Sequence, residues 1–179
     1  MMNDTTVRAE TFEWAGPVFG PRVETGMSGL AYLAGVRDGM VPPPDLGPLL
    51  RAELVEVDRG RVELICSAAD PHFGLLWELD PGLAGVLLST AVNCVARSLM
   101  GLHQGWATVA AQSAYVRPIS PRVSNLISTA EVIESSDRRA IVRAELTDEF
   151  GQVLATASTT LDIFDRDPCP TSYALELQG

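Results

Sequence analysis

The feature that most constrains the fold is a long run, Pro81 to Met100, which is apolar over most of its length and has no internal proline. Asp80 before it is a favourable N-cap residue, Pro81 suits the first helical position, and Gly101 is a typical C-cap residue. The run therefore predicts one helix that is apolar around most of its circumference. Such a helix must be covered on most sides, and a curved antiparallel sheet is the economical cover for a chain of 179 residues.

Alternating apolar and polar residues predict the strands of that sheet. The clearest alternation runs from Val153 to Phe164, where Val153, Ala155 and Ala157 begin one face. The other segments with strand periodicity are a hairpin from Arg51 to Cys66 with a turn at Asp58-Arg59-Gly60, and the strands Trp106 to Val116, Leu126 to Ile133 and Arg139 to Leu146.

A short amphipathic helix is expected near the N-terminus, because Ser28 suits an N-cap and Leu30, Leu33 and Ala34 recur at helical spacing before Gly39. The expected fold is therefore α+β, with about six antiparallel strands curved round one long central helix. We expect an N-terminal arm over 1–27, one domain over 28–165 and a C-terminal tail over 166–179. A hydrophobic content of 46% supports one domain of this size.

Charge and composition exclude several classes of function. The net charge is −10 and all thirteen basic residues are arginine, so we expect neither nucleic-acid nor membrane binding and no lysine-based chemistry. The three cysteines are widely spaced and show no zinc or redox motif. We expect buried thiols, no metal and no cofactor. The start of the chain does not have the pattern of a signal peptide, and no apolar run is long enough to predict a membrane span, so we expect a cytoplasmic protein.

Two segments resemble motifs of the PaaI-like acyl-CoA thioesterases, a family of the hotdog-fold superfamily. The first, Ala114-Tyr115-Val116-Arg117-Pro118, is similar to the family's N-Y-L-R-P. The second, Thr-Asp-Glu-Phe-Gly-Gln-Val-Leu-Ala-Thr-Ala over 147–157, is similar to T-D-E-D-G-R-L-L-A-T-A. The resemblance extends over about 28–164. It implies a hotdog fold, coenzyme A thioesters as substrates, and a homodimer or homotetramer with active sites between subunits.

The sequence departs from the family where the catalytic groups belong. The family has H-G-G and, nine positions after the histidine, an Asp or Glu on the central helix. This chain has Asp80-Pro81-Gly82 and then Ser89 at those positions. In the family, the N–H of the first glycine stabilises the oxyanion. Pro81 has no N–H, which leaves the N–H groups of Gly82 or Leu83 as substitutes.

The candidate catalytic residues are Asp80, Ser89 and Asn93. Asp80 is also fully explained as a plain N-cap. Ser89, Asn93 and Arg97 form a polar line at successive i,i+4 spacings on the helix, which indicates either a pocket wall or packing against a neighbouring subunit. The resemblance implies that several arginines approach coenzyme A phosphates, although these could equally be solvated. The candidate ligand-binding residues are His72, Gly82, Thr90, Tyr115, Arg117, Arg138 and Arg139.

Two hypotheses of function follow. In the first, the protein is an acyl-CoA thioesterase with a displaced catalytic apparatus that uses Asp80 or Glu78 as base. In the second, it is a catalytically silent hotdog protein that binds an acyl-CoA or acts as a structural partner.

Overall fold

The computed structural model describes residues 26–41, 50–68, 80–120 and 122–165. The predicted arm and tail lie outside these residues, except for Gly26 and Met27. The described part contains two helices, α1 (Gly29–Arg37) and α3 (Pro81–Leu99), and six strands. The strands are β1 (Ala52–Asp58), β2 (Arg61–Ser67), β3 (Gln104–Tyr115), β4 (Asn125–Ser135), β5 (Arg139–Asp148) and β6 (Val153–Asp165).

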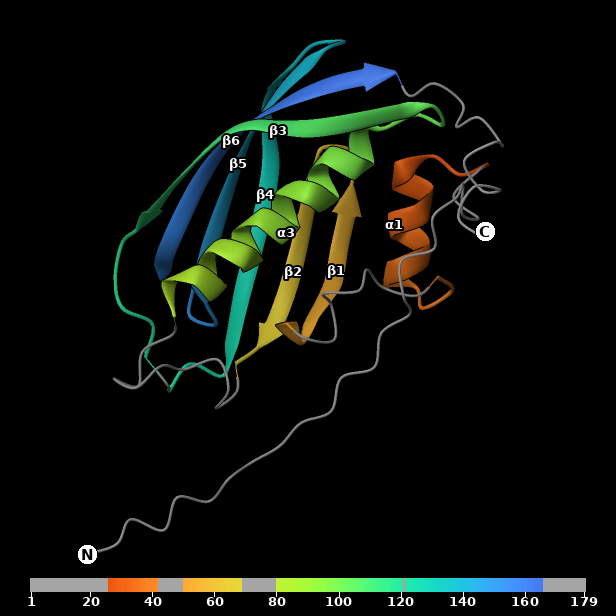
Figure 1. The fold of residues 1–179 in the computed structure, drawn as a ribbon. Coiled ribbons are helices and arrows are strands. Elements are labelled where there is room, and N and C mark those ends of the chain that lie inside the picture. Colours follow the sequence, from red (N-terminus) through yellow and green to blue (C-terminus); the bar gives the residue numbers. More distant parts are fainter. Residues whose placement is uncertain (1–25, 42–49, 69–79, 121, 166–179) are drawn as a thin grey trace, which may run out of the picture.

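All six strands form one antiparallel sheet in the order β1-β2-β4-β5-β6-β3. The sheet curves round α3, and α1 lies beside the C-terminal half of that helix (Figure 1). The predicted α+β fold, with its short N-terminal helix, is therefore confirmed. Strand β3 pairs with β6 and with no other described strand, so it forms one edge of the sheet.

The core lies between α3 and the concave face of the sheet. On β5, the alternating residues predicted to share one face, Ala140, Val142, Ala144 and Leu146, are all buried. By length and composition α3 could cross a membrane, but half of its apolar window is buried inside the protein, as in the core helix of a soluble domain. The buried residues of α3 are Ala84, Leu87, Leu88, Ala91, Val92, Cys94, Val95, Ala96 and Ser98.

The α1 helix begins against the last turn of α3. Its first residue, Gly29, donates its backbone N–H to the carbonyl of Met100 at 3.1 Å. A Cβ atom at Gly29 would lie 1.8 Å from the carbonyl oxygen of Arg97, far inside van der Waals contact. The close approach of the two helices therefore requires glycine at this position.

We expect Gly29→Ala to lower the free energy of unfolding by about 1–3 kcal/mol, because the new methyl group must push α1 away from α3. Thermal and urea unfolding measure the change. Gly101→Ala is the matched control, since its Cβ would meet only the side chain of Gln104, at 3.4 Å. Equal stabilities of the two variants would contradict the close packing of the helices.

Candidate functional site

The N-terminus of α3 is closed by its own cap. Asp80 accepts the N–H of Gly82 on its Oδ1 at 2.7 Å, and its backbone carbonyl accepts the N–H groups of Leu83 and Ala84 at 2.9 and 3.2 Å. Pro81, at the first helical position, has no N–H. The predicted N-cap is confirmed. The N–H groups of Gly82 and Leu83, expected as substitute oxyanion donors, are already engaged within the cap.

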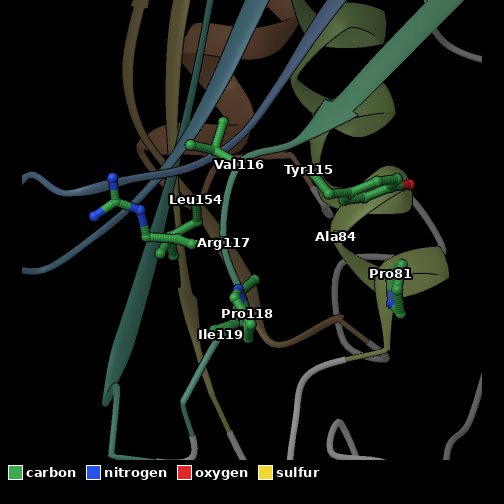
Figure 2. A pocket seen from close by; sticks show the side chains of 8 residues that line it. All are labelled: Pro81, Ala84, Tyr115, Val116, Arg117, Pro118, Ile119 and Leu154. Carbon is green, nitrogen blue, oxygen red and sulfur yellow. The ribbon is translucent and has the colours of Figure 1, made fainter.

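A pocket of about 310 Å³ lies beside this helix end. Its walls come from the first turn of α3, from the end of β3 with the segment that follows, and from β6 (Figure 2). The backbone N–H groups of Val116 and Arg117 donate to the carbonyl of Leu154 at 2.8 and 3.3 Å, which joins the segment after β3 to β6. The pocket is lined mainly by apolar side chains, namely Pro81, Ala84, Tyr115, Val116, Pro118, Ile119 and Leu154, together with Arg117.

Tyr115 is the aromatic residue of this pocket. Its ring lies over the first turns of α3, and its hydroxyl points to the side of the pocket on which Pro81 lies (Figure 2). The hydroxyl is 3.3 Å from the position that a Cβ of Gly85 would take, so the absence of a side chain at Gly85 lets the ring approach the helix. Tyr115 is 52% exposed and its hydroxyl makes no hydrogen bond to another described residue. It is therefore free to donate to a ligand.

Arg117 lies on the rim of the pocket and not within it. Its guanidinium group points away from Pro81 and Tyr115 (Figure 2). The side chain is exposed and forms no ion pair with another described residue. The cavity itself is therefore lined by uncharged groups, with one cation at its edge.

Arg138 and Arg139 lie at the far end of the sheet. Arg139 pairs with Asp162 of β6 at 2.8 Å, whereas the pocket is at the other end of β6, beside Leu154. The intervening length of strand corresponds to roughly 25 Å. Within one chain, the structure does not bring Arg117 together with Arg138 and Arg139.

The predicted polar line on α3 also lies outside the pocket. Ser89 and Asn93 are exposed, roughly 7 and 13 Å along the helix from Ala84. The indole N–H of Trp106 donates to Oδ1 of Asn93 at 3.5 Å. The Arg97 guanidinium group, which continues the line, stacks on the Trp106 ring at 5.5 Å from its centroid.

The remaining candidate residues are either engaged elsewhere or lie outside the described part of the chain. The Thr90 hydroxyl donates to the Val86 carbonyl within α3 at 2.8 Å, so it is engaged in the helix. His72 and Glu78 lie outside the described residues. Within the described part of the chain, no group of three or more metal-ligating side chains occurs.

The described cysteines are unsuited to act as nucleophiles. Burial raises the pKa of Cys66 and of Cys94 to about 11 in each case. Both thiols are therefore protonated near neutral pH, and Cys66 donates its Sγ–H to the Leu50 carbonyl. The expectation of buried thiols is confirmed for these two residues, and Cys169 lies outside the described range.

A carboxylate of the β5–β6 turn fixes the segment that follows β3. Ser124 donates its backbone N–H to Oε1 of Glu149 at 3.0 Å, and this bond is the main cause that lowers the pKa of Glu149. In the same turn, Oδ1 of Asp148 accepts the N–H groups of Phe150 and Gln152. The start of the segment over 147–157, the second of the two family-like motifs, thus has a structural role at the end of the sheet where the pocket lies.

Sequence reasoning missed most of the pocket wall. Ala84, Val116, Ile119 and Leu154 are small or aliphatic residues that no chemical motif distinguishes. Gly85 was also missed, although a glycine inside a predicted helix indicates a close contact with another group. The glycine itself signals a close contact, but nothing in the sequence indicates that the contacting residue is Tyr115.

Among the comparisons with known proteins, the one with solved structures supports this fold. No protein-family model and no curated protein matches the chain. Among solved structures, a thioesterase family protein from Silicibacter pomeroyi is 23% identical with a TM-score of 0.64, over 75% of this chain and 98% of that one. The Escherichia coli PaaI protein of the phenylacetic acid degradation operon is 13% identical with a TM-score of 0.66, over 76% and 96% of the two chains.

A further similar structure is that of a hypothetical thioesterase protein from Streptococcus pneumoniae with coenzyme A. It is 14% identical with a TM-score of 0.58, and the match covers 65% of this chain and 88% of that one. At these identities the likeness establishes the fold. The chain therefore has the hotdog fold of PaaI-like thioesterases, as its strand motifs predict.

Proposed function

We propose that this protein binds coenzyme A thioesters and holds their acyl group in the pocket beside the N-terminus of α3. The observation that carries the proposal is the pocket itself, about 310 Å³ of mainly apolar lining with the cation of Arg117 at its rim. An apolar acyl chain suits such a lining, and a phosphate group suits an exposed arginine. The fold shared with thioesterases supports the same ligand class.

Hydrolysis of the bound thioester is the second part of the proposal, and it depends on Asp80. Only Oδ1 of this exposed carboxylate is used by the cap, and Oδ2 makes no hydrogen bond to a described residue. Asp80 directly precedes Pro81, which is part of the pocket wall. A carboxylate in this position could activate a water molecule for attack on the thioester carbonyl. Without that step, the protein would bind acyl-CoA and leave it intact.

The protein is expected to work as a dimer formed through β3. This edge strand contains no charged residue and no proline, and its residues from Ala107 to Tyr115 are all exposed in one chain. Soluble proteins rarely leave a long uncharged edge strand uncovered, so a second copy of β3 is its natural partner. The exposed stripe of Val86, Ser89 and Asn93 on α3 would then face the partner subunit.

Antiparallel pairing of two β3 strands would also complete the site. The start of one strand would lie beside the end of the other, so Trp106 of the partner subunit would approach Tyr115 and the pocket. Asn93, which accepts the indole N–H of Trp106, would approach with it, and Arg138, which lies beyond β6, would be at the same end of the partner's sheet. The partner subunit could thereby supply the polar and basic groups that one chain places at the far end of the sheet.

Wild-type protein is expected to bind acyl-CoA thioesters, as measured by calorimetry. If Asp80 is the base, Asp80→Asn lowers the rate of thiol release by about 100- to 10,000-fold. Asparagine caps helices as well as aspartate does, so this variant should keep its thermal stability. Asp80→Ala, which loses the cap, should be about 0.5–2 kcal/mol less stable.

The outcomes separate the two parts of the proposal. Binding without release of thiol from any acyl-CoA would leave a binding protein and overturn hydrolysis. Turnover unchanged in Asp80→Asn would exclude Asp80 as the base. Failure to bind any acyl-CoA would overturn the proposed ligand class.

For the dimer, we expect Val109→Glu to convert the protein to a monomer in light scattering coupled to gel filtration, and to weaken acyl-CoA binding. Val109 is 51% exposed at the bulge of β3, where a charge would be buried by a second copy. Ile133→Glu is the matched control, because Ile133 is 56% exposed at a bulge of the interior strand β4. A monomeric wild-type protein, or a dimeric Val109→Glu variant, would rule out pairing through β3.

A further inference from the structure

The backbone N–H groups in the first turn of α3 are not available to a ligand in the pocket. Pro81 has no N–H, and the N–H groups of Gly82, Leu83 and Ala84 all donate to Asp80. The Asp80 carboxylate also places a negative charge at the positive end of the helix dipole. A ligand carbonyl beside Pro81 would therefore find no free backbone donor in the first turn of α3.

The Tyr115 hydroxyl is the polar donor that remains among the described residues lining the pocket cavity. Arg117 directs its guanidinium group away from the cavity, and the other lining residues are apolar or proline. The hydroxyl makes no hydrogen bond to another described residue and is held next to α3 by the space at Gly85. A phenol hydroxyl at the exposed edge of an apolar pocket can donate a hydrogen bond to a ligand that brings it an acceptor.

The geometry points to Tyr115 as the residue that recognises the carbonyl group of the bound thioester. Its hydroxyl donates a hydrogen bond to the carbonyl oxygen, in place of the backbone N–H that Pro81 eliminates. Gly85 is the positioning residue, because a side chain there would displace the hydroxyl. This assignment rests on the proposed binding of coenzyme A thioesters but not on their hydrolysis.

Two analogues that resist hydrolysis isolate this hydrogen bond. One is the ketone analogue of hexanoyl-CoA, in which a methylene group replaces the thioester sulfur and the carbonyl remains. The other is hexyl-CoA, a thioether that lacks the carbonyl. Wild-type protein is expected to bind the ketone about 3- to 10-fold more tightly than the thioether, the range for one hydrogen bond.

Tyr115→Phe should abolish that preference while it leaves the affinity for the thioether unchanged, since the ring and its packing remain. Tyr32→Phe removes a hydroxyl from α1, outside the pocket, and should keep the preference. Gly85→Ala should reduce the preference, because its Cβ would lie 3.3 Å from the Tyr115 hydroxyl. In the Tyr115→Phe background, Gly85→Ala should cause no further loss of preference.

A carbonyl preference that survives in Tyr115→Phe would overturn the role of this hydroxyl, as would a wild-type protein that binds both analogues equally. Neither of these results would affect the proposed ligand class, because both analogues would still bind. If neither analogue binds the wild-type protein, the proposed function and the role of Tyr115 both fail. Thermal unfolding of each variant verifies that a lost preference does not reflect loss of the fold.

Discussion

The burial of α3 against the concave face of the sheet is the constraint on which the rest of the structure depends. Small residues such as Ala84, Ala91 and Ala96 on its buried side let the helix approach the strands. The sheet covers only part of the helix, so Ser89 and Asn93 remain exposed. The α1 helix packs against the C-terminal end of α3 (Figure 1), while the pocket lies beside the N-terminal end of α3. The position of the candidate site thus follows from how the core is closed.

The first residues of α3 combine two effects that oppose each other. Asp80 and Pro81 make an efficient start to the helix, because the carboxylate satisfies an N–H group and proline is already constrained to helical geometry. The same two residues remove the features that suit a helix N-terminus to bind an anion, namely free N–H groups and an uncompensated dipole. This helix end is therefore better suited to a neutral carbonyl held by a side-chain donor than to an oxyanion held by backbone.

The sequence predicts the elements well because each depends on local pattern. The cap at Asp80, the alternation on β5 and the apolar character of α3 are all short-range signals, and the structure contains each of them. The pocket could not be predicted in the same way. Ile119 and Leu154 have no chemical signature, and they line the same pocket as Ala84 only because β3 adds to the sheet beside β6, a strand distant from it in the sequence. The contact between Gly85 and Tyr115 depends on the same long-range pairing.

The three candidate arginines differ in whether their charge is already used in an ion pair. The sequence groups Arg117, Arg138 and Arg139 as candidates to bind phosphate, but the structure distinguishes them. Arg139 is already paired with Asp162, so a phosphate would have to compete with that carboxylate. Arg117 and Arg138 are exposed and form no ion pair with another described residue.

Coenzyme A, the ligand class proposed above, carries phosphate groups, so a protein with a net charge of −10 would repel it at long range and the proposed binding would depend on such local cations. Arg117 at the pocket rim is the residue best placed to provide that local attraction. Its exposed position means that salt would screen the attraction strongly, whereas the apolar contacts of the acyl group would persist. Under the proposed function, the affinity for coenzyme A thioesters is therefore expected to have a salt-sensitive part at Arg117 and a salt-insensitive part within the pocket.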